Sequence, residues 1–227
     1  GIEKAVREEQ QKERISRLFG QYVSPEVKDR IVSEKAEVSG ERKSVVVLFS
    51  DLRGFSGFSE GHDAEFVVSV LNEYFDTMVA CIQSHGGVGD KFMGDAVMAA
   101  FGGLIPLDNP AHDAVAAALE MRVALQGLNE RNALRGVPRM ENGIGLHFGE
   151  VLQGPIGSRN RKEFTVIGDA VNIASRLEGL TRQGPGRIYV SGAVHDRLPP
   201  DLQGRCRAVG PTLLKGKQKE VLVFAVE

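Results

Sequence analysis

The strongest fold signal in this chain is the stretch SVVVLFSD, residues 44–51. Five apolar residues in a row, three of them β-branched, are typical of a strand that is buried on both faces of a sheet. The run ends at Asp51, and a carboxylate so close to the core is costly to bury unless something pairs with it. The stretch therefore predicts a central strand with an acidic group at its end.

Outward from this strand, helix and strand patterns alternate. Apolar residues with helical spacing over 67–82 precede two short strand-like runs, 88–92 and 96–101, which flank a Gly94-Asp95 turn. A helix from Asn109 to about Leu128, a strand pair at 143–147 and 151–156, a helix from about Gly168 to Glu178, and strand-like segments at 188–190, 206–209 and 221–226 complete the order. This order predicts an α+β fold, a ferredoxin-like βαββαβ palm with additional C-terminal strands.

The residues before the first strand form a segment of different character. Residues 1–19 are highly charged and contain no proline, which predicts a solvated helix, and Ser24-Pro25 favours a short second helix from Pro25 to Val32. Two interpretations of the first helix stay open: a frayed helix, or the end of a parallel coiled coil from an upstream module. We therefore expect a helical linker over residues 1–43 and one catalytic domain over 44–227.

Composition excludes several classes of protein. The 227 residues carry 28 Lys and Arg against 30 Asp and Glu, a net charge of −2, which argues against a general nucleic-acid binder. No apolar run approaches the ~20 residues that span a bilayer, and no signal peptide is visible. Cys81 and Cys206 lie far apart in sequence, and we expect both to be reduced residues of a cytosolic protein.

Two acidic residues point to a metal site. In an antiparallel βαββ sheet the strands that end at Asp51 and begin after Asp95 are neighbours, so the two carboxylates can meet at one edge. Two close carboxylates repel each other unless a cation joins them. Oxygen-only ligands suit Mg²⁺ or Mn²⁺, whereas the alternative is that each aspartate only caps a turn.

Other polar groups suit a phosphate-bearing ligand. Gly54-Phe55-Ser56 follows Asp51 at a strand-to-helix turn, where backbone N–H groups can cradle phosphate, although an ordinary turn is the alternative. Asn172 and Arg176 are one helical turn apart and project on one face, which suits recognition of a hydroxyl and a phosphoryl oxygen, or merely a surface pair. Lys91 and Lys215 are either ligand-binding or solvent-exposed lysines.

Three blocks carry a resemblance to a known family. LFSDLRGF at 48–55, DKFMGD at 90–95 and FTVIGDAVNIASRLE at 164–178 resemble, in this order, the catalytic domain of class III nucleotidyl cyclases over about residues 44–226. The resemblance implies a catalytic centre shared across a head-to-tail homodimer, ATP as substrate, and two divalent ions per site. The residues before the domain, FGQYVSP at 19–25, resemble the linker of bacterial receptor cyclases. We therefore expect a cytoplasmic catalytic domain with an upstream sensor, and a membrane-embedded sensor stays open.

The resemblance also implies a role for each candidate residue. Asp51 and Asp95 would bind the metal ions, Lys91 and Thr165 would select the purine, and Asn172 would orient the ribose. Arg176 would stabilise the transition state, Lys215 would hold the terminal phosphates, and the backbone at Leu52, Gly54, Phe55 and Ser56 would take the triphosphate.

The residue at position 165 bears on the choice of substrate. Thr165 resembles the subclass often labelled IIIb, and with Lys91 it favours adenine, because the ammonium can donate to adenine N1 and the hydroxyl can accept from the exocyclic amine. The sequence therefore predicts an adenylate cyclase that forms 3′,5′-cyclic AMP and pyrophosphate. A guanylate cyclase and a silent nucleotide-binding or dimerisation module remain alternatives, whereas a diguanylate cyclase lacks its Gly-Gly-Asp/Glu-Glu-Phe turn here.

Overall fold

The computed structural model describes residues 40–184, 186–216 and 219–227, together with Val6, Arg7, Glu9, Gln11, Glu13, Val27 and Lys28. The chain divides into two compact units, residues 1–39 and 40–227. The described residues of the first unit are helical. Most of the expected linker helices, including the coiled-coil question, lie outside the described residues and stay predictions.

The second unit is built on one sheet. Its strands are β1 (Glu41–Arg53), β2 (Val88–Met93), β3 (Ala96–Phe101), β4 (Glu141–Gly157), β5 (Lys162–Ile167), β6 (Ile188–Ser191), β7 (Cys206–Thr212) and β8 (Val221–Val226). Its helices are α3 (Phe55–Glu60), α4 (Ala64–Ser84), α5 (Pro110–Ala133), α6 (Asp169–Leu180), α7 (Gly192–His195) and α8 (Pro200–Gln203). None of the helices in the described part of the chain combines the length and apolar character that crossing a membrane requires.

The strand order confirms the predicted α+β fold. Strands run in the order β2-β3-β1-β4-β6-β8-β7, and β5 pairs with the far part of β4. The first four are all antiparallel, and their order is that of a ferredoxin-like βαββαβ unit. The predicted C-terminal strands β6, β7 and β8 extend this sheet beyond β4, where β6 lies parallel to β4.

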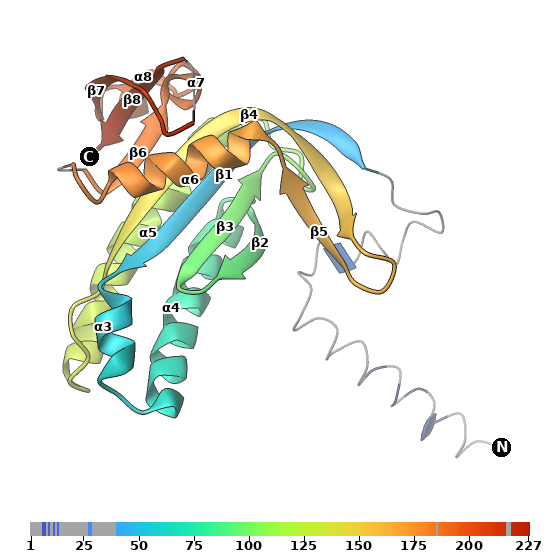
Figure 1. Ribbon diagram of the computed structural model, residues 1–227, viewed down its shortest axis with the longest axis vertical. Coiled ribbons are helices and arrows are strands. Elements are labelled where there is room, and N and C mark those ends of the chain that lie inside the picture. The colour runs from blue at the N-terminus through green and yellow to red at the C-terminus, as the bar shows by residue number, and fades with distance from the viewer. Residues whose placement is uncertain are drawn as a thin grey trace. The chain divides into compact units, whose positions relative to one another are not determined.

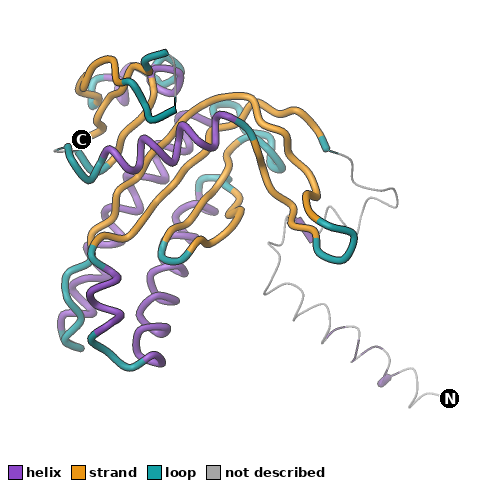
Figure 2. The backbone as a smooth tube through the Cα atoms, in the orientation of Figure 1, coloured by secondary structure: helices purple, strands orange, loops and turns teal. Residues whose placement is uncertain are grey.

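Helices cover both faces of the sheet near β1. Val46 and Leu48 pack in one cluster with α4 and α5, whereas Val45, Val47 and Phe49 pack in another with α6. Figures 1 and 2 show α6 lying across β1 and β4 on the side opposite α4 and α5. The uninterrupted apolar run is explained by this arrangement, because alternate side chains of β1 are buried on both faces.

The structure corrects the prediction of two short strands at 143–147 and 151–156, because β4 is continuous from Glu141 to Gly157. Gly149 stays in register opposite Val45, and a Cβ there would lie 2.9 Å from the Cβ of Ala170 on α6. At Gly145 a Cβ would lie 2.2 Å from the backbone nitrogen of Glu178. The glycines of β4 therefore make room for α6 rather than end the strand. The sequence also did not indicate α3, β5, α7 or α8, and β1 begins three residues earlier than the predicted start.

Candidate active site

Asp51 and Asp95 lie at the same place in the sheet, as predicted. Asp51 is near the end of β1 and opposite Ala96 in the β1–β3 register. Asp95 directly precedes Ala96 in the β2–β3 turn, where Gly94 has a φ of 63° that favours glycine. Burial raises the pKa of Asp51 above its ordinary value, and repulsion from Asp95 raises it further. The two carboxylates therefore act on each other electrostatically.

Two residues at the end of α6 join this group, although sequence analysis did not place them here. The guanidinium of Arg182 forms an ion pair with Oδ2 of Asp51, which opposes the rise in the pKa of Asp51. Glu178 is buried, and its Oε1 has no hydrogen-bond partner among the described residues. Burial, followed by repulsion from Asp51, raises the pKa of Glu178 to about 7. We call Asp51, Asp95, Glu178 and Arg182 the carboxylate edge.

The carboxylate edge fits a divalent cation. Such an ion would have few protein ligands, because within the described residues no group of three or more His, Cys, Asp or Glu side chains could hold a metal ion. Mg²⁺ is commonly bound by one or two carboxylates and completes its shell with water and substrate phosphates. The repulsion between Asp51 and Asp95 is the observation that fits such an ion, because a cation between them would relieve it.

Lys91 and Thr165 come together from β2 and β5. The hydroxyl of Thr165 donates a 2.6 Å hydrogen bond to Oδ2 of Asp90, the residue before Lys91. The Lys91 ammonium is 3.9 Å from Oδ2 of Asp90 and 3.4 Å from Oε2 of Glu163. Lys91 is therefore not simply solvated, because carboxylates of two strands hold it beside Thr165. We call Asp90 and Lys91 of β2, together with Thr165 of β5, the polar cluster.

Asn172 and Arg176 lie on the side of α6 away from the sheet. Ile173, Ala174 and Leu177 of this helix are buried, while Asn172 is exposed and Arg176 is half-buried. The turn that carries Lys215 approaches Arg176, because a Cβ at Gly216 would lie 3.4 Å from Nη2 of Arg176. The structure thus brings the Lys215 turn to the same end of the site as the guanidinium.

The turn after Asp51 has the expected form. Gly54 has a φ of 71°, a left-handed conformation that lets the chain leave β1 and enter α3. Leu52 is buried, whereas Gly54 and Ser56 are exposed and Phe55 is half-buried. These four residues directly follow Asp51 of the carboxylate edge in the sequence. Their contact with a triphosphate remains a prediction.

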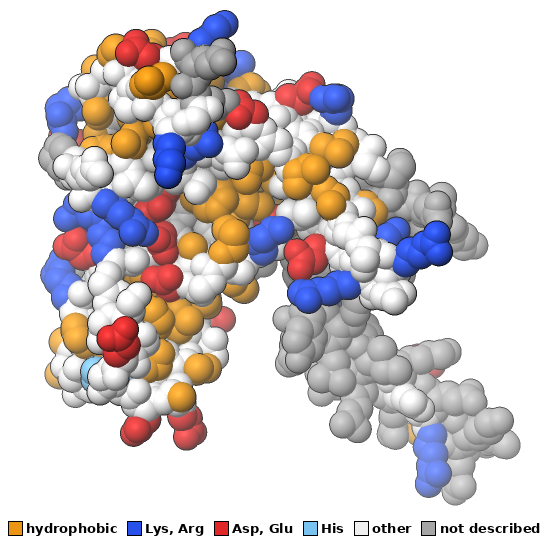
Figure 3. All heavy atoms as spheres, in the orientation of Figure 1, with side chains coloured by type: hydrophobic (Ala, Val, Ile, Leu, Met, Phe, Trp, Pro, Cys, Tyr) orange, Lys and Arg blue, Asp and Glu red, His pale blue; other side chains and the backbone are white. Residues whose placement is uncertain are grey.

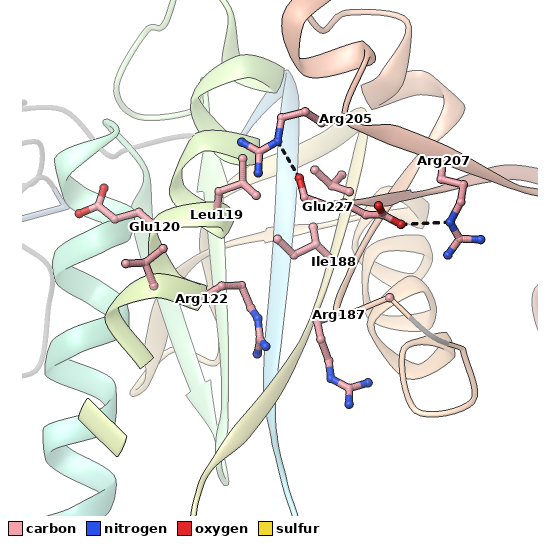
Figure 4. A pocket seen from close by; sticks show the side chains of 11 residues that line it. Leu119, Glu120, Arg122, Arg187, Ile188, Arg205, Arg207 and Glu227 are labelled. Carbon is pink, nitrogen blue, oxygen red and sulfur yellow. Dashed lines mark hydrogen bonds and ion pairs between the residues drawn. The ribbon is translucent and has the colours of Figure 1, made fainter. Parts of the chain in front are cut away.

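A cavity of about 710 Å³ lies away from all of these groups. It is lined by apolar residues of α5, β6 and β8 and by Arg122, Arg187, Arg205 and Arg207. Figure 4 shows Arg205 and Arg207 directed at Glu227, which both contact. None of the predicted site residues lines this cavity, so we assign the chemistry to the carboxylate edge and the polar cluster instead.

Comparison with known proteins identifies the family. Residues 37–227 match the family described as the adenylate and guanylate cyclase catalytic domain. The chain belongs to this family.

Curated relatives of this cyclase domain include proteins named adenylate cyclase. A protein named adenylate cyclase from Anabaena cylindrica is 34% identical over 200 residues, which are 86% of this chain and 39% of the relative. Adenylate cyclase 1 from Rhizobium meliloti is 31% identical over 185 residues, 82% of this chain and 28% of the relative. This chain therefore spans well under half the length of these curated relatives.

Solved structures agree with the fold. The adenylyl cyclase CyaB from P. aeruginosa has a TM-score of 0.76 at 31% identity, over 83% of this chain and 96% of that chain. The guanylyl cyclase Cya2 has a TM-score of 0.75 at 37% identity, over 82% of this chain and 93% of that chain. Since both an adenylyl and a guanylyl cyclase are this similar, family membership alone does not decide the purine.

Proposed function

We propose that this cyclase domain converts ATP to 3′,5′-cyclic AMP and pyrophosphate. In this reaction a bond forms between the ribose 3′-oxygen and the α-phosphorus, the bond from that phosphorus to the pyrophosphate oxygen breaks, and the hydroxyl proton is released. The observation that carries the choice of ATP is the meeting of Lys91 and Thr165. A lysine donor beside a threonine oxygen complements the N1 and the exocyclic amine of adenine.

We assign the remaining roles to residues of the site. Asp51 and Asp95 would hold two Mg²⁺ or Mn²⁺ ions. When bound, such ions lower the pKa of the attacking hydroxyl and neutralise the leaving group. Asn172 would orient the ribose, and Arg176 would donate to the α-phosphoryl oxygens as charge develops there. Lys215 and the backbone at Leu52, Gly54, Phe55 and Ser56 would bind the phosphates.

We infer that two chains share each site in a head-to-tail homodimer. Exposed apolar side chains on the β4–β5 hairpin support this inference: Leu152 and Ile167 are cross-strand partners on β4 and β5, and they are 40% and 46% exposed. Figure 3 shows further hydrophobic side chains gathered in the middle of the face that carries α6, bordered by charged ones. Because this chain is shorter than its relatives, we also propose an upstream sensor module, with tethering to a membrane as one form of it.

The first experiment measures product from purified protein with Mn²⁺ and either ATP or GTP. We expect cyclic AMP and pyrophosphate in equal amounts from ATP. Cyclic GMP should form from GTP at a much lower rate. Equal rates with the two nucleotides would contradict the adenine assignment. Nucleotide binding without turnover, under conditions where the protein is folded, would favour the silent module.

The second experiment tests the shared site. Asp95→Ala and Arg176→Ala should each be nearly inactive; for Arg176→Ala we expect kcat to fall ~10²-fold with little change in KM, because its contact forms mainly in the transition state. In a mixed dimer one site collects both changes and the other collects none. Equal mixing should therefore recover about a quarter of wild-type activity. Sites built within single chains would give no recovery despite proven heterodimers.

A further inference from the structure

Asp90 is a buried carboxylate to which the assigned mechanism gives no role. Its side chain is 8% exposed, on β2, and it accepts the hydrogen bond from the Thr165 hydroxyl of β5, 75 residues away in sequence. The 2.6 Å distance between the two oxygens is typical of a hydroxyl that donates to an ionised carboxylate. Asp90 therefore determines where the single hydroxyl proton of Thr165 points.

The direction of this proton changes what Thr165 can recognise. A hydroxyl has one hydrogen to donate and two lone pairs that accept. An ionised carboxylate only accepts, so the proton lies between Thr165 and Asp90, and Oγ1 offers any other ligand lone pairs alone. Thr165 is 4% exposed, so water has little access to compete for the proton. Burial raises the pKa of Asp90 to about 6, which still leaves it ionised at neutral pH.

We propose that Asp90 is a positioning residue that makes Thr165 an acceptor only and thereby favours adenine over guanine. Adenine presents N1 as an acceptor and its exocyclic amine as a donor, whereas guanine presents N1–H as a donor and O6 as an acceptor. With the Lys91 ammonium as donor and Oγ1 of Thr165 as acceptor, adenine matches at both positions and guanine at neither. This inference rests on the proposed function, because it assumes that the polar cluster contacts the purine.

Glu163, which lies next to the polar cluster, provides a matched comparison. Its carboxylate is 3.4 Å from the Lys91 ammonium, closer than Asp90, but its side chain is 52% exposed and Thr165 directs its proton to Asp90. If carboxylates acted only by holding Lys91, Glu163 would matter at least as much as Asp90. If Asp90 acts through Thr165, only Asp90 affects the choice of base.

The test is the ratio of kcat/KM for ATP to that for GTP in Asp90→Asn. The asparagine amide can donate to Oγ1, which frees the Thr165 hydroxyl to donate to guanine O6. We expect the ratio to fall about tenfold, the usual scale for one mismatched polar contact in a binding site. Glu163→Gln, the control, should keep the wild-type ratio. The ratio of dissociation constants for the α,β-methylene analogues of ATP and GTP should shift in parallel, and it is independent of turnover.

A double-mutant cycle shows whether Asp90 acts through Thr165. In a Thr165→Val background the hydroxyl is gone, so adding Asp90→Asn should leave the purine ratio unchanged. An equal fall of the ratio in that background would overturn the proposal, and so would a folded Asp90→Asn protein with the wild-type ratio. If wild type fails to cyclise ATP, the proposed function fails, while the analogue ratio still tests Asp90.

Should Asp90→Asn not fold, the wild-type protein provides a second measurement. Asp90 faces Lys91 on its own strand and Glu163 and Thr165 on β5. Protonated Asp90 can itself donate to Oγ1, so the analogue ratio should favour ATP less at pH 5 than at pH 8. Glu163→Gln should show the same change with pH. A ratio that is flat over this range would contradict the proposal.

Discussion

The carboxylate edge and the polar cluster differ in how their charges are balanced. In the polar cluster, the Asp90 carboxylate accepts from Thr165 and lies within an ion-pair distance of Lys91. At the carboxylate edge, burial and then repulsion from neighbouring carboxylates raise the pKa of Asp51 and of Glu178, and one exposed arginine opposes both rises. The polar cluster, which we propose contacts the base, is therefore charge-balanced by residues of this chain. The carboxylate edge, which we propose performs the chemistry, retains a repulsion between carboxylates that an added cation would relieve.

The largest expected effect is that of Asp95→Asn. We expect kcat to fall by about 10³-fold, the upper range for loss of one charge-stabilising group. Mn²⁺ binding, measured by calorimetry, should weaken in parallel, because one of the two carboxylates is gone. The α,β-methylene ATP to GTP binding ratio should stay at the wild-type value. If that ratio changed as well, the two regions would not be independent.

Glu178→Gln should reveal the cost of burying the Glu178 carboxylate beside other acidic groups. The pKa of Glu178 is raised from 4.5 to about 7 on folding, so the folded state binds more protons than the unfolded state between these values. Stability contributed by this group is therefore present below about pH 4.5 and is lost as the pH rises through about 7. The loss amounts to at most about 3 kcal/mol.

The measurement is urea unfolding of wild type and Glu178→Gln in the presence of a chelator. Glutamine cannot ionise, so the variant should gain stability relative to wild type between pH 5 and pH 8. A difference between the two proteins that is the same at both pH values would show that burial and its acidic neighbours do not disfavour the ionised form of Glu178.

Arg182→Gln should have a smaller effect on the same region. The Arg182 side chain is 61% exposed, and an ion pair of this kind contributes about 1 kcal/mol or less. Because a cation that binds Asp51 competes with this guanidinium, we expect Mn²⁺ to bind about two- to fivefold more tightly to the variant. Arg187→Gln is the matched control, since Arg187 pairs with Glu141 and should leave Mn²⁺ binding unchanged. Weaker Mn²⁺ binding to Arg182→Gln would mean that the arginine supports the metal site.

The smallest effect is expected for Thr165→Ser. Serine keeps the hydroxyl that donates to Asp90, so the ATP to GTP ratio of kcat/KM should remain within about twofold of wild type. Metal binding should be unaffected. A collapse of the ratio in this variant would mean that the methyl group of Thr165, and not its hydroxyl, distinguishes the bases.

The sequence predicted those parts of the fold that local patterns determine. The β1 run, the Gly94-Asp95 turn and the Asn172–Arg176 spacing are each visible within a few residues, and the structure places them as expected. Two strands were predicted in place of β4 because a glycine that makes room for a helix, such as Gly149, has the same local pattern as a glycine that ends a strand. β5 was missed because its strand pattern is short and begins with two charged residues, Lys162 and Glu163.

The sequence singled out candidate site residues one by one but not the contacts between them. Arg182 pairs with Asp51 across 131 residues of sequence, and it follows α6 in a turn with no motif of its own. Glu178 gave a weak signal, since it is a carboxylate on the buried stripe of α6, four residues after Ala174. Contacts of this kind depend on how α6 packs on β4, which no local pattern reports.

The packing of α6 on β4 also limits how this sequence can change over generations. A Cβ at Gly145 would meet backbone atoms of α6 at 2.2 and 2.4 Å, so no rotation of a side chain could make room for it. At Gly143 the nearest atom is the rotatable hydroxyl of Thr181. In a saturation library selected for folded protein, position 145 should retain glycine alone, while position 143 should also accept alanine when position 181 varies with it. The helix that carries Asn172 and Arg176 can thus lie against β4 only because residue 145 has no Cβ. Neutral drift has no other residue to place there.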